Sequence, residues 1–362
     1  MSEHPPRAGG ASLDVLRFLA AGFILLFHFG ASAPRNLHDL VPVLGQGWLA
    51  TDFFLLLSGF ILMRAYGPRL AAGRVNAPHF VVRRVMRLWP SHLVALILMW
   101  GAVTLATLQG HPPDHAEKYG AVAFWQEAFL IHGWGLSDTP AWNVPTWTLS
   151  ALVVCYVLFS LYAGHVYSWS RRCLWLGLVF VLVAGEGLAA LSGQTFVDLP
   201  FRWGLLRAIP LFLAGSLLER LTEGLRVTPR TYAAGLIGCL GGVLVLGSLP
   251  RHPATDLLLL GGLAAVLCLS AGVALPESRV TRRLGRASYS LFLTHSLIGA
   301  VALGIDGMLV HRFGLSEPSH WLVWSMSVIA AVLFALIFEA FVDRPLSERV
   351  TLWLNRRRTV VA

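Results

Sequence analysis

Hydrophobic positions fall into ten long runs separated by short polar stretches. A membrane-spanning helix needs about 20 apolar residues, and each run comes close to that length. The runs cover residues 14–33, 48–66, 88–108, 147–164, 174–191, 203–219, 231–248, 256–274, 287–304 and 321–342. An eleventh stretch, 121–132, is too short to span and is interpreted as an interfacial or re-entrant piece of a long external loop. The pattern predicts an all-α, polytopic membrane helix bundle of about ten transmembrane helices.

Composition supports a membrane protein rather than a soluble one. Hydrophobic residues make up 56% of the chain and charged residues only 13%, whereas soluble domains carry about 25% charged residues. The gaps between the apolar runs leave no room for a separate soluble catalytic domain. We therefore expect a single integral-membrane domain over residues 1–362, ending in a basic cytoplasmic tail at 343–362. The first run is too long for a signal peptide and lacks a small-residue cleavage site, so we expect it to be retained.

Most basic residues lie in every second segment between the apolar runs, which places them on one side of the predicted bundle. With the N-terminus inside, 22 of the 28 Lys and Arg residues fall in inner segments. Cytoplasmic loops carry such an excess, so both termini are predicted to be cytoplasmic. The net charge of +9 is divided among these segments rather than gathered in one patch, which argues against nucleic acid as a partner. The four cysteines form no CxxC pair or His/Cys cluster, so neither a disulfide framework nor a metal site is expected.

Ionisable residues inside membrane spans are costly and are candidates for function. Six of those in the predicted spans are taken as candidates: His28, Asp52, Glu186, Arg207, His295 and Glu339. His28 follows Arg17 by 11 residues, which returns to within about 20° of the same helix face and rises about 16 Å. Arg17 at the inner surface and His28 near mid-bilayer should therefore point the same way. The alternative is that His28 is a core histidine bonded to a neighbouring helix.

Two further features are candidates for a functional site: a pair of arginines and a second histidine within a span. Arg84 and Arg87 are i, i+3 neighbours on one face at the inner end of the third run. Arginine matches phosphate oxygens in pairs, so a phosphorylated ligand is one interpretation, and simple membrane anchoring is the other. His295 lies about two turns inside a run that has the same direction as the first. Its depth matches that of His28, so the two imidazoles can meet, although His295 could instead bond a backbone carbonyl.

Several motifs in order along the chain resemble the acyltransferase 3 family of integral-membrane O-acyltransferases, in particular the stand-alone members that O-acetylate exopolysaccharide. The segments are LDVLRFLAAGFILLFHF, with Arg17 and His28, GWLATDFFLLLSGFIL, with Asp52, Ser58 and Gly59, RRVMRLWP, with Arg84 and Arg87, NVPTWTLSALVVCYVLF, with Trp147, LGRASYSLFLTHSL, with His295, and FEAFVDRPL. Together they cover essentially the whole chain.

The chain departs from the family pattern at two places. Where the family commonly has Trp-Ser-Leu-Ser-x-Glu, Leu152 replaces the acid and Ala151 precedes it. The terminal Glu-Arg-Pro pattern is Asp343-Arg344-Pro345, which is a milder change. The sequence also lacks the fused extracytoplasmic esterase-like domain of some members. The missing acid argues against a mechanism that needs a carboxylate at this position. It marks the chain as a member of a subgroup or, alternatively, as an impaired member.

The resemblance implies a multi-pass protein of the bacterial inner membrane that transfers an acetyl group from cytoplasmic acetyl-CoA. The acceptor would be a sugar hydroxyl of an extracytoplasmic or lipid-linked polysaccharide unit. The expected donor-binding residues are Arg17, Arg84 and Arg87, the expected catalytic residues His28, His295 and Asp52, and the expected substrate-binding residues Trp147 and Ser58. His28 would act as general base or as a transient acyl carrier. Interfacial anchoring is the alternative for Trp147, and close helix packing for Ser58.

Two other functions fit the same features. A transporter or flippase for lipid-linked saccharides would also use intramembrane charges, but it would not consume acyl-CoA. A scaffold subunit of a polysaccharide-assembly complex is made more plausible by Leu152, and in that protein Arg17 and His28 would be dispensable. Release of free CoA by the purified protein separates an acyltransferase from both.

Overall fold

The computed structural model describes residues 10–113, 115–249 and 251–360, and these are predominantly helical. Ten helical segments of this part are long and apolar enough to cross a membrane, so the predicted number of spans is confirmed. The helices are α1 (Gly10–Gly30), α2 (Leu37–Leu40), α3 (Trp48–Ala71), α4 (Ala77–Leu108), α5 (Ala121–Ala128), α6 (Trp147–Tyr167), α7 (Arg171–Ala190), α8 (Gly204–Thr222), α9 (Pro229–Gly247), α10 (Pro253–Gly272), α11 (Arg279–Phe313), α12 (Glu317–Phe338) and α13 (Arg344–Val360).

The short apolar stretch at 121–132 contains α5, a helix of 8 residues. A helix of this length is too short to span a membrane, as the sequence predicted. Helices α4 and α11 extend well beyond their predicted runs, because each begins with polar, arginine-bearing turns that precede the apolar part. Their first turns are capped by side chains that satisfy free backbone N–H groups. Asn76 accepts a bond from the backbone of His79, and Ser278 and Thr281 form a capping box.

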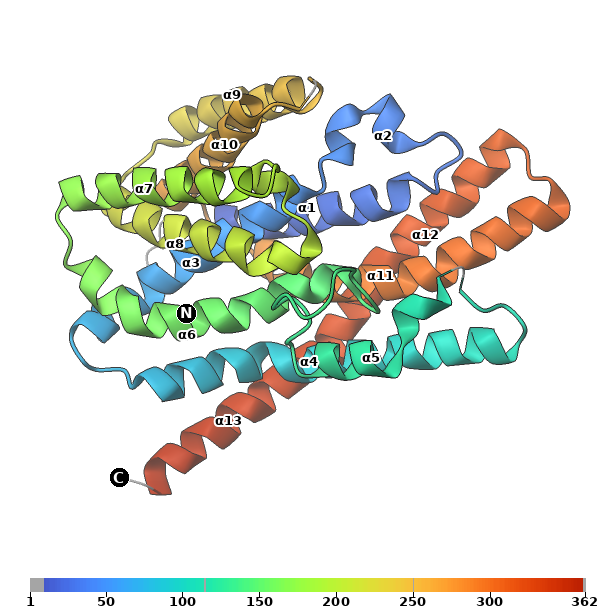
Figure 1. Ribbon diagram of the computed structural model, residues 1–362, viewed down its shortest axis with the longest axis horizontal. Helices are drawn as coiled ribbons and strands as arrows, with labels where there is room; N and C mark the ends of the chain where they lie inside the picture. The colour runs from blue at the N-terminus through green and yellow to red at the C-terminus, as the bar shows by residue number, and fades with distance from the viewer. Residues whose placement is uncertain (1–9, 114, 250, 361–362) are drawn as a thin grey trace.

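The long helices lie side by side along the longest axis of the molecule (Figure 1). The connections α3–α4 and α6–α7 lie at the left of this view, where α13 also ends, and the α11–α12 connection lies at the right. We call the left end the basic end, because its two connections carry or adjoin Arg69, Arg74, Arg171 and Arg172. The distribution of charge predicts that this end faces the cytoplasm.

Small residues allow two helices at the centre to touch. A Cβ on Gly59 of α3 would overlap the carbonyl oxygen of Phe212 in α8, and one on Gly215 of α8 would overlap that of Leu56 in α3. The two glycines thus make room reciprocally for the facing backbone. Gly59 therefore serves packing.

The last span contains an unusual turn. Five residues, Glu339–Asp343, form a π-helical segment that joins α12 to α13. Such segments are rare and frequently occur at functional sites. The predicted basic tail begins here, and the structure gives it as a helix, α13, that contacts α4. The turn brings Glu339 and Asp343, both buried, toward arginines of α11 and α4.

Candidate functional site

Helices α1 and α11 pack against each other and bring two histidines together. The ring centroids of His28 and His295 lie 5.2 Å apart, so the predicted meeting of the two imidazoles is confirmed. His295 is fully buried, whereas His28 is partly exposed. The two side chains thus lie next to each other at the contact between α1 and α11.

The two rings are held in different ways. Nδ1 of His295 lies 3.0 Å from the carbonyl oxygen of Leu291. A carbonyl only accepts, so Nδ1 donates its hydrogen and the neutral ring keeps a lone pair on Nε2. His28 packs edge-on against Phe27, and within residues 10–113, 115–249 and 251–360 neither of its ring nitrogens has a hydrogen-bond partner. Among the described residues, His28 thus lacks the hydrogen bond to a neighbouring helix that its alternative interpretation requires, and its role stays a prediction.

A cavity of about 460 Å³ lies within the bundle, formed by α1, α3, α4, α6 and α11. Its charged wall contains one acid, Asp14, and four arginines: Arg17, Arg87, Arg282 and Arg286. Ser58, Leu152 and Tyr156 also line it. Each of the four arginines pairs with an acid: Arg17 with Asp14, Arg87 with Asp343, Arg282 with Glu277 and Arg286 with Glu339. The N–H donors that these pairs leave unused suit an anionic ligand. Leu152 leaves this wall without the carboxylate that the family pattern commonly has there.

Two phenylalanines connect the cavity to the histidines. Phe54 and Phe292 both line the cavity, with ring centroids 5.8 Å apart. The ring of Phe292 is also 6.3 Å from that of His295. The cavity is thus basic on one side and apolar on the side that adjoins the imidazole pair.

The three predicted donor-binding arginines do not share one environment. Arg17 and Arg87 line the cavity, and Arg84 lies in a smaller neighbouring cavity of about 110 Å³ that Arg87 also lines. The guanidinium of Arg84 lies 4.6 Å from the centre of the Tyr66 ring, in a cation–π contact. The structure therefore brings Arg17 and Arg87 together at the cavity and places Arg84 in the adjoining one.

The π-helical turn fixes the orientation of Arg87. Both carboxylate oxygens of Asp343 accept bonds from Arg87, at 2.8 and 3.0 Å, and Ser91 donates a third at 2.7 Å. Arg286 pairs with Glu339 of the same turn at 2.9 Å. Asp343 was not identified as a site residue from the sequence, although it belongs to the quoted segment FEAFVDRPL. Its partner is 256 positions away.

Comparison with known proteins agrees with this geometry. The model of a family described as "Acyltransferase domain", acyltransferase 3, matches residues 11–340. The chain belongs to the acyltransferase 3 family. It is also 36% identical over 199 residues to "Protein 2 in picA locus" of Rhizobium radiobacter, which covers 54% of this chain and 100% of that protein. No solved structure matches the chain. The protein is accordingly a multi-pass membrane acyltransferase.

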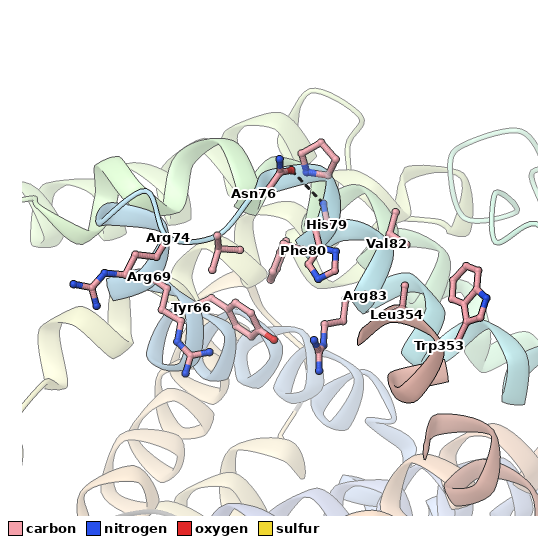
Figure 2. Close-up of a pocket in the computed structure, with 12 residues that line it drawn as sticks. Tyr66, Arg69, Arg74, Asn76, His79, Phe80, Val82, Arg83, Trp353 and Leu354 are labelled. Atoms are coloured by element: carbon pink, nitrogen blue, oxygen red, sulfur yellow. Dashed lines mark hydrogen bonds between the residues drawn. The ribbon is translucent and has the colours of Figure 1, made fainter. Parts of the chain in front are cut away.

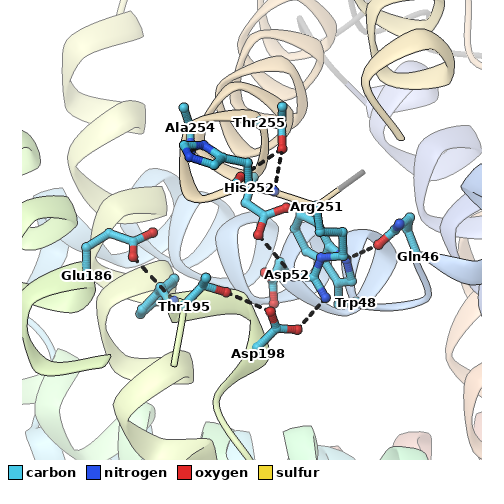
Figure 3. Close-up of polar contacts among 12 residues, drawn as sticks. Gln46, Trp48, Asp52, Glu186, Thr195, Asp198, Arg251, His252, Ala254 and Thr255 are labelled. Carbon is cyan, nitrogen blue, oxygen red and sulfur yellow. Dashed lines mark hydrogen bonds and ion pairs between the residues drawn. The ribbon is translucent and has the colours of Figure 1, made fainter. Parts of the chain in front are cut away.

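Asp52 of this acyltransferase lies in a different environment from the histidines. It is fully buried and pairs with Arg207 of α8 at 2.8 Å, so two of the six intramembrane ionisable residues neutralise each other. Figure 3 shows Asp52 beside a second group of charges, in which Arg251 contacts Asp198 and, at 3.0 Å, Asp256. Burial of paired charges is consistent with a structural role, and a role for Asp52 in catalysis stays a prediction.

The two predicted substrate-binding residues also differ in position. Ser58 lines the cavity, but its hydroxyl donates to the carbonyl oxygen of Phe54 at 2.7 Å. The ring of Trp147 packs against Gly204 at the start of α8, where a Cβ would approach it to 3.0 Å. The substrate-binding roles of Ser58 and Trp147 stay predictions.

A buried polar cluster in the long loop of the acyltransferase was not predicted. The carboxylate of Glu127 accepts bonds from the hydroxyl of Thr146, at 2.9 Å, and from the backbone N–H of Asn143, at 3.2 Å. The Asn143 side chain donates to the carbonyl oxygen of Leu293, two residues before His295, at 2.7 Å. Burial raises the pKa of Glu127 to about 8 and, with help from nearby His92, lowers the pKa of His132 to about 3. The cluster thus ties the loop to the helix that carries His295.

The polar groups of the cavity suit an anionic organic ligand. Among the described residues no group of three or more His, Cys, Asp or Glu side chains could hold a metal ion. The cavity instead offers guanidinium groups, which bind phosphate and carboxylate oxygens through paired N–H donors.

Proposed function

We propose that this acyltransferase is an O-acetyltransferase that moves an acetyl group from acetyl-CoA to a sugar hydroxyl of an extracytoplasmic or lipid-linked polysaccharide. The observation that carries the proposal is the cavity, which begins at a group of arginines and ends at two phenylalanines beside the histidine pair. Acetyl-CoA has a matching arrangement: its phosphates suit the arginines at one end of the cavity, and its slender acylated arm suits the apolar end beside the histidines.

The donor would bind with its phosphates at the arginines. Arg17 and Arg87 face the cavity, and Asp343 uses two N–H groups of Arg87 out of the five that a guanidinium has. The remaining donors of Arg87 are available to phosphate oxygens. The arm of the donor would then lie along Leu152 and Phe292, with the thioester near His28 and His295.

His28 is proposed to act as general base. It would take the proton of the acceptor hydroxyl while that oxygen bonds to the thioester carbonyl carbon. The carbon–sulfur bond then breaks, and the sulfur of the departing CoA takes the proton from His28. This transfers one acetyl group, forms one ester and returns His28 to its starting state. Nε2 of His295, which the Ser296 hydroxyl approaches to 3.5 Å, would accept a hydrogen bond from the substrate hydroxyl in place of that contact.

An acyl-carrier role for His28 is the second version of the same mechanism. In that version Nε2 or Nδ1 of His28 would first take the acetyl group and then pass it to the acceptor. The absence of a hydrogen bond to either nitrogen, within the part of the chain that the structure describes, suits both versions. We favour the base because it needs no additional intermediate.

The preference for acetyl is supported by the two phenylalanines. Phe54 and Phe292 line the cavity with their ring centres 5.8 Å apart, and the Phe292 ring lies 6.3 Å from that of His295. A short acyl group needs less space beside these rings than a longer one. Acetyl is accordingly the acyl group that we propose.

Replacement of His28 tests this function in cells. Cells lacking the gene are complemented with the wild type, with His28→Ala or with His165→Ala, a control at an exposed histidine of α6. We expect O-acetyl esters on the polysaccharide to be restored by the wild type and the control but not by His28→Ala at equal membrane abundance. Full acetylation with His28→Ala would contradict the proposal.

A further inference from the structure

A groove of about 870 Å³ lies at the basic end, outside the cavity that adjoins the histidines. It is formed by the end of α3, the α3–α4 connection, the start of α4 and part of α13. The two spaces have no lining residue in common. The small cavity of Arg84 lies between them, because it shares Tyr66 and Arg83 with the groove and Arg87 with the inner cavity.

The groove is lined by cationic side chains and by no carboxylate. Arg69, Arg74 and Arg83 face it, and Arg84 adjoins it. Among the described residues, none of these four arginines forms an ion pair with an acid, whereas Arg87 and Arg286 close by do. Three guanidinium groups that line the groove and a fourth beside it attract an anion, since none of them pairs with an acid in the described part of the chain.

Aromatic rings lie between these charges. Figure 2 shows Arg69 and Arg74 on one side of Tyr66 and Arg83 on the other. The Tyr66 ring lies beneath two guanidinium groups, with Arg84 at 4.6 Å and Arg69 at 6.0 Å from its centre. Trp353 of α13 lines the groove at the right of this view and is 45% exposed. The lining therefore suits an anion that also carries an apolar or aromatic part.

One atom of this group lacks the partner that its burial requires. The Nε of Arg84 is buried without a hydrogen-bond partner among the described residues. Buried N–H groups are normally paired, and an unpaired one is costly. A ligand with several strong acceptor oxygens would supply what the arginines of this region lack.

We propose that the groove is a second binding site, for an organic phosphate, at the basic end of the molecule. Guanidinium groups recognise phosphate oxygens, and Tyr66 and Trp353 would contact the rest of the ligand. Two sources share this chemistry. One is the nucleotide phosphate of a donor whose pyrophosphate lies at Arg17 and Arg87 and whose arm enters the inner cavity, and the other is the headgroup of an anionic phospholipid at the membrane surface. The nucleotide source rests on the proposed function, and the lipid source does not.

The test uses the purified full-length protein and a variant, Arg69→Gln with Arg74→Gln. The matched control is Arg171→Gln with Arg172→Gln, which removes the same charge from two exposed positions at the same end. In one arm, adenosine 3′,5′-bisphosphate is titrated in neutral detergent by calorimetry. In the other, the protein is placed in nanodiscs of phosphatidylglycerol or phosphatidylcholine, and retained lipid is measured by native mass spectrometry.

We expect the groove variant to bind one of the two probes at least about tenfold more weakly than wild type, and the control to bind it as wild type does. Loss of nucleotide binding identifies the donor as the source, and loss of phosphatidylglycerol retention identifies the lipid. Equal binding of both probes by wild type, variant and control would overturn the proposal. Neither probe is an acyl thioester, so neither can act as the donor, and His28→Ala should bind both normally. A failure of acyl transfer alone would therefore leave this site intact.

Discussion

Individual residues at the centre of the bundle divide into those that are held by partners and those that are not. His295 is fixed by the carbonyl of Leu291, and Arg87 is fixed by Asp343. His28 has no such restraint within the described residues, although its ring lies 5.2 Å from that of His295. A fixed base beside an unrestrained one is a suitable arrangement for moving a proton during the reaction.

Phe292 should determine which acyl group is accepted. Phe292→Ala removes the ring between the cavity and His295, so longer acyl groups gain space. We expect the preference for acetyl-CoA over butanoyl-CoA, measured as a ratio of kcat/KM values, to fall by about tenfold or more, since a few methylene groups are worth roughly 1–3 kcal/mol in such a pocket. Phe180→Ala, on an exposed face of α7, is the control and should keep the wild-type ratio. An unchanged ratio in Phe292→Ala would remove the phenylalanine from acyl selection.

Glu127 should make stability depend on pH. Burial raises its pKa to about 8 from 4.5, so the folded protein keeps this proton where the unfolded chain has lost it. The resulting stabilisation is complete below about pH 4.5 and is lost as the pH rises through about 8, with a slope of up to about 1.4 kcal/mol per pH unit. Glu127→Gln mimics the protonated carboxyl and should show a smaller fall in Tm between pH 5 and 8 in detergent. Parallel curves for the two proteins would mean that Glu127 is ionised when folded.

At the scale of helices, close contact of backbones holds the centre of the bundle. Helices α3 and α8 meet through Gly59 and Gly215, and the same pair of helices carries the buried ion pair between Asp52 and Arg207. Good packing at this contact keeps two opposite charges within 2.8 Å in an apolar medium. The contact between α1 and α11 plays the same part for the two histidines.

Gly215→Ala should loosen the contact between α3 and α8. Its new methyl group would overlap the carbonyl oxygen of Leu56, so a backbone must shift, at a cost of about 1–3 kcal/mol. We expect a Tm several degrees below that of the wild type. Gly241→Ala in α9 is the matched control, since a Cβ there meets nothing within 4 Å. That variant should be as stable as wild type or slightly more so, because alanine favours helix. Equal Tm values for the two variants would argue against close packing at Gly215.

The sequence predicted those features that depend on local order along one helix. Ten apolar runs gave ten long helices, and the similar depths of His28 and His295 correctly predicted that their rings could meet. Pairing between distant helices was not predictable in this way. Asp343 meets Arg87 across 256 positions, and Arg207 meets Asp52 across 155. Such partners depend on which helices become neighbours, and a hydrophobic pattern does not encode this.

The boundaries of helices were less predictable for a related reason. Arginine-bearing turns continue α4 and α11 at the basic end, where polar side chains reach water and a hydropathy pattern stops. The burial of Glu127 was not predicted, because the residue lies in a helix of only 8 residues. A single acid in so short a segment is normally expected at the surface. Its burial becomes visible only when the loop folds back against α4, α6 and α11.

Across the whole molecule, arginines near the basic end and aromatic side chains near His295 line one cavity. Arginines of α1, α4 and α11 face one cavity, and aromatic side chains lead from it to His295. If the basic end faces the cytoplasm, as the charge distribution predicts, the donor enters from inside and the acceptor approaches from the other side. The membrane then separates the two substrates until they meet at His28.

Free CoA release by the purified acyltransferase tests this account most directly. The protein is reconstituted in nanodiscs and given acetyl-CoA with the polysaccharide and lipid-linked fraction of cells that lack the gene, and free thiol is followed over time. We expect the wild type and His165→Ala to release CoA and to leave acetyl ester on the added fraction, while His28→Ala, folded to the same Tm, loses at least about a hundredfold in rate. Equal CoA release by wild type and His28→Ala would contradict the central claim that the histidine pair performs acyl transfer.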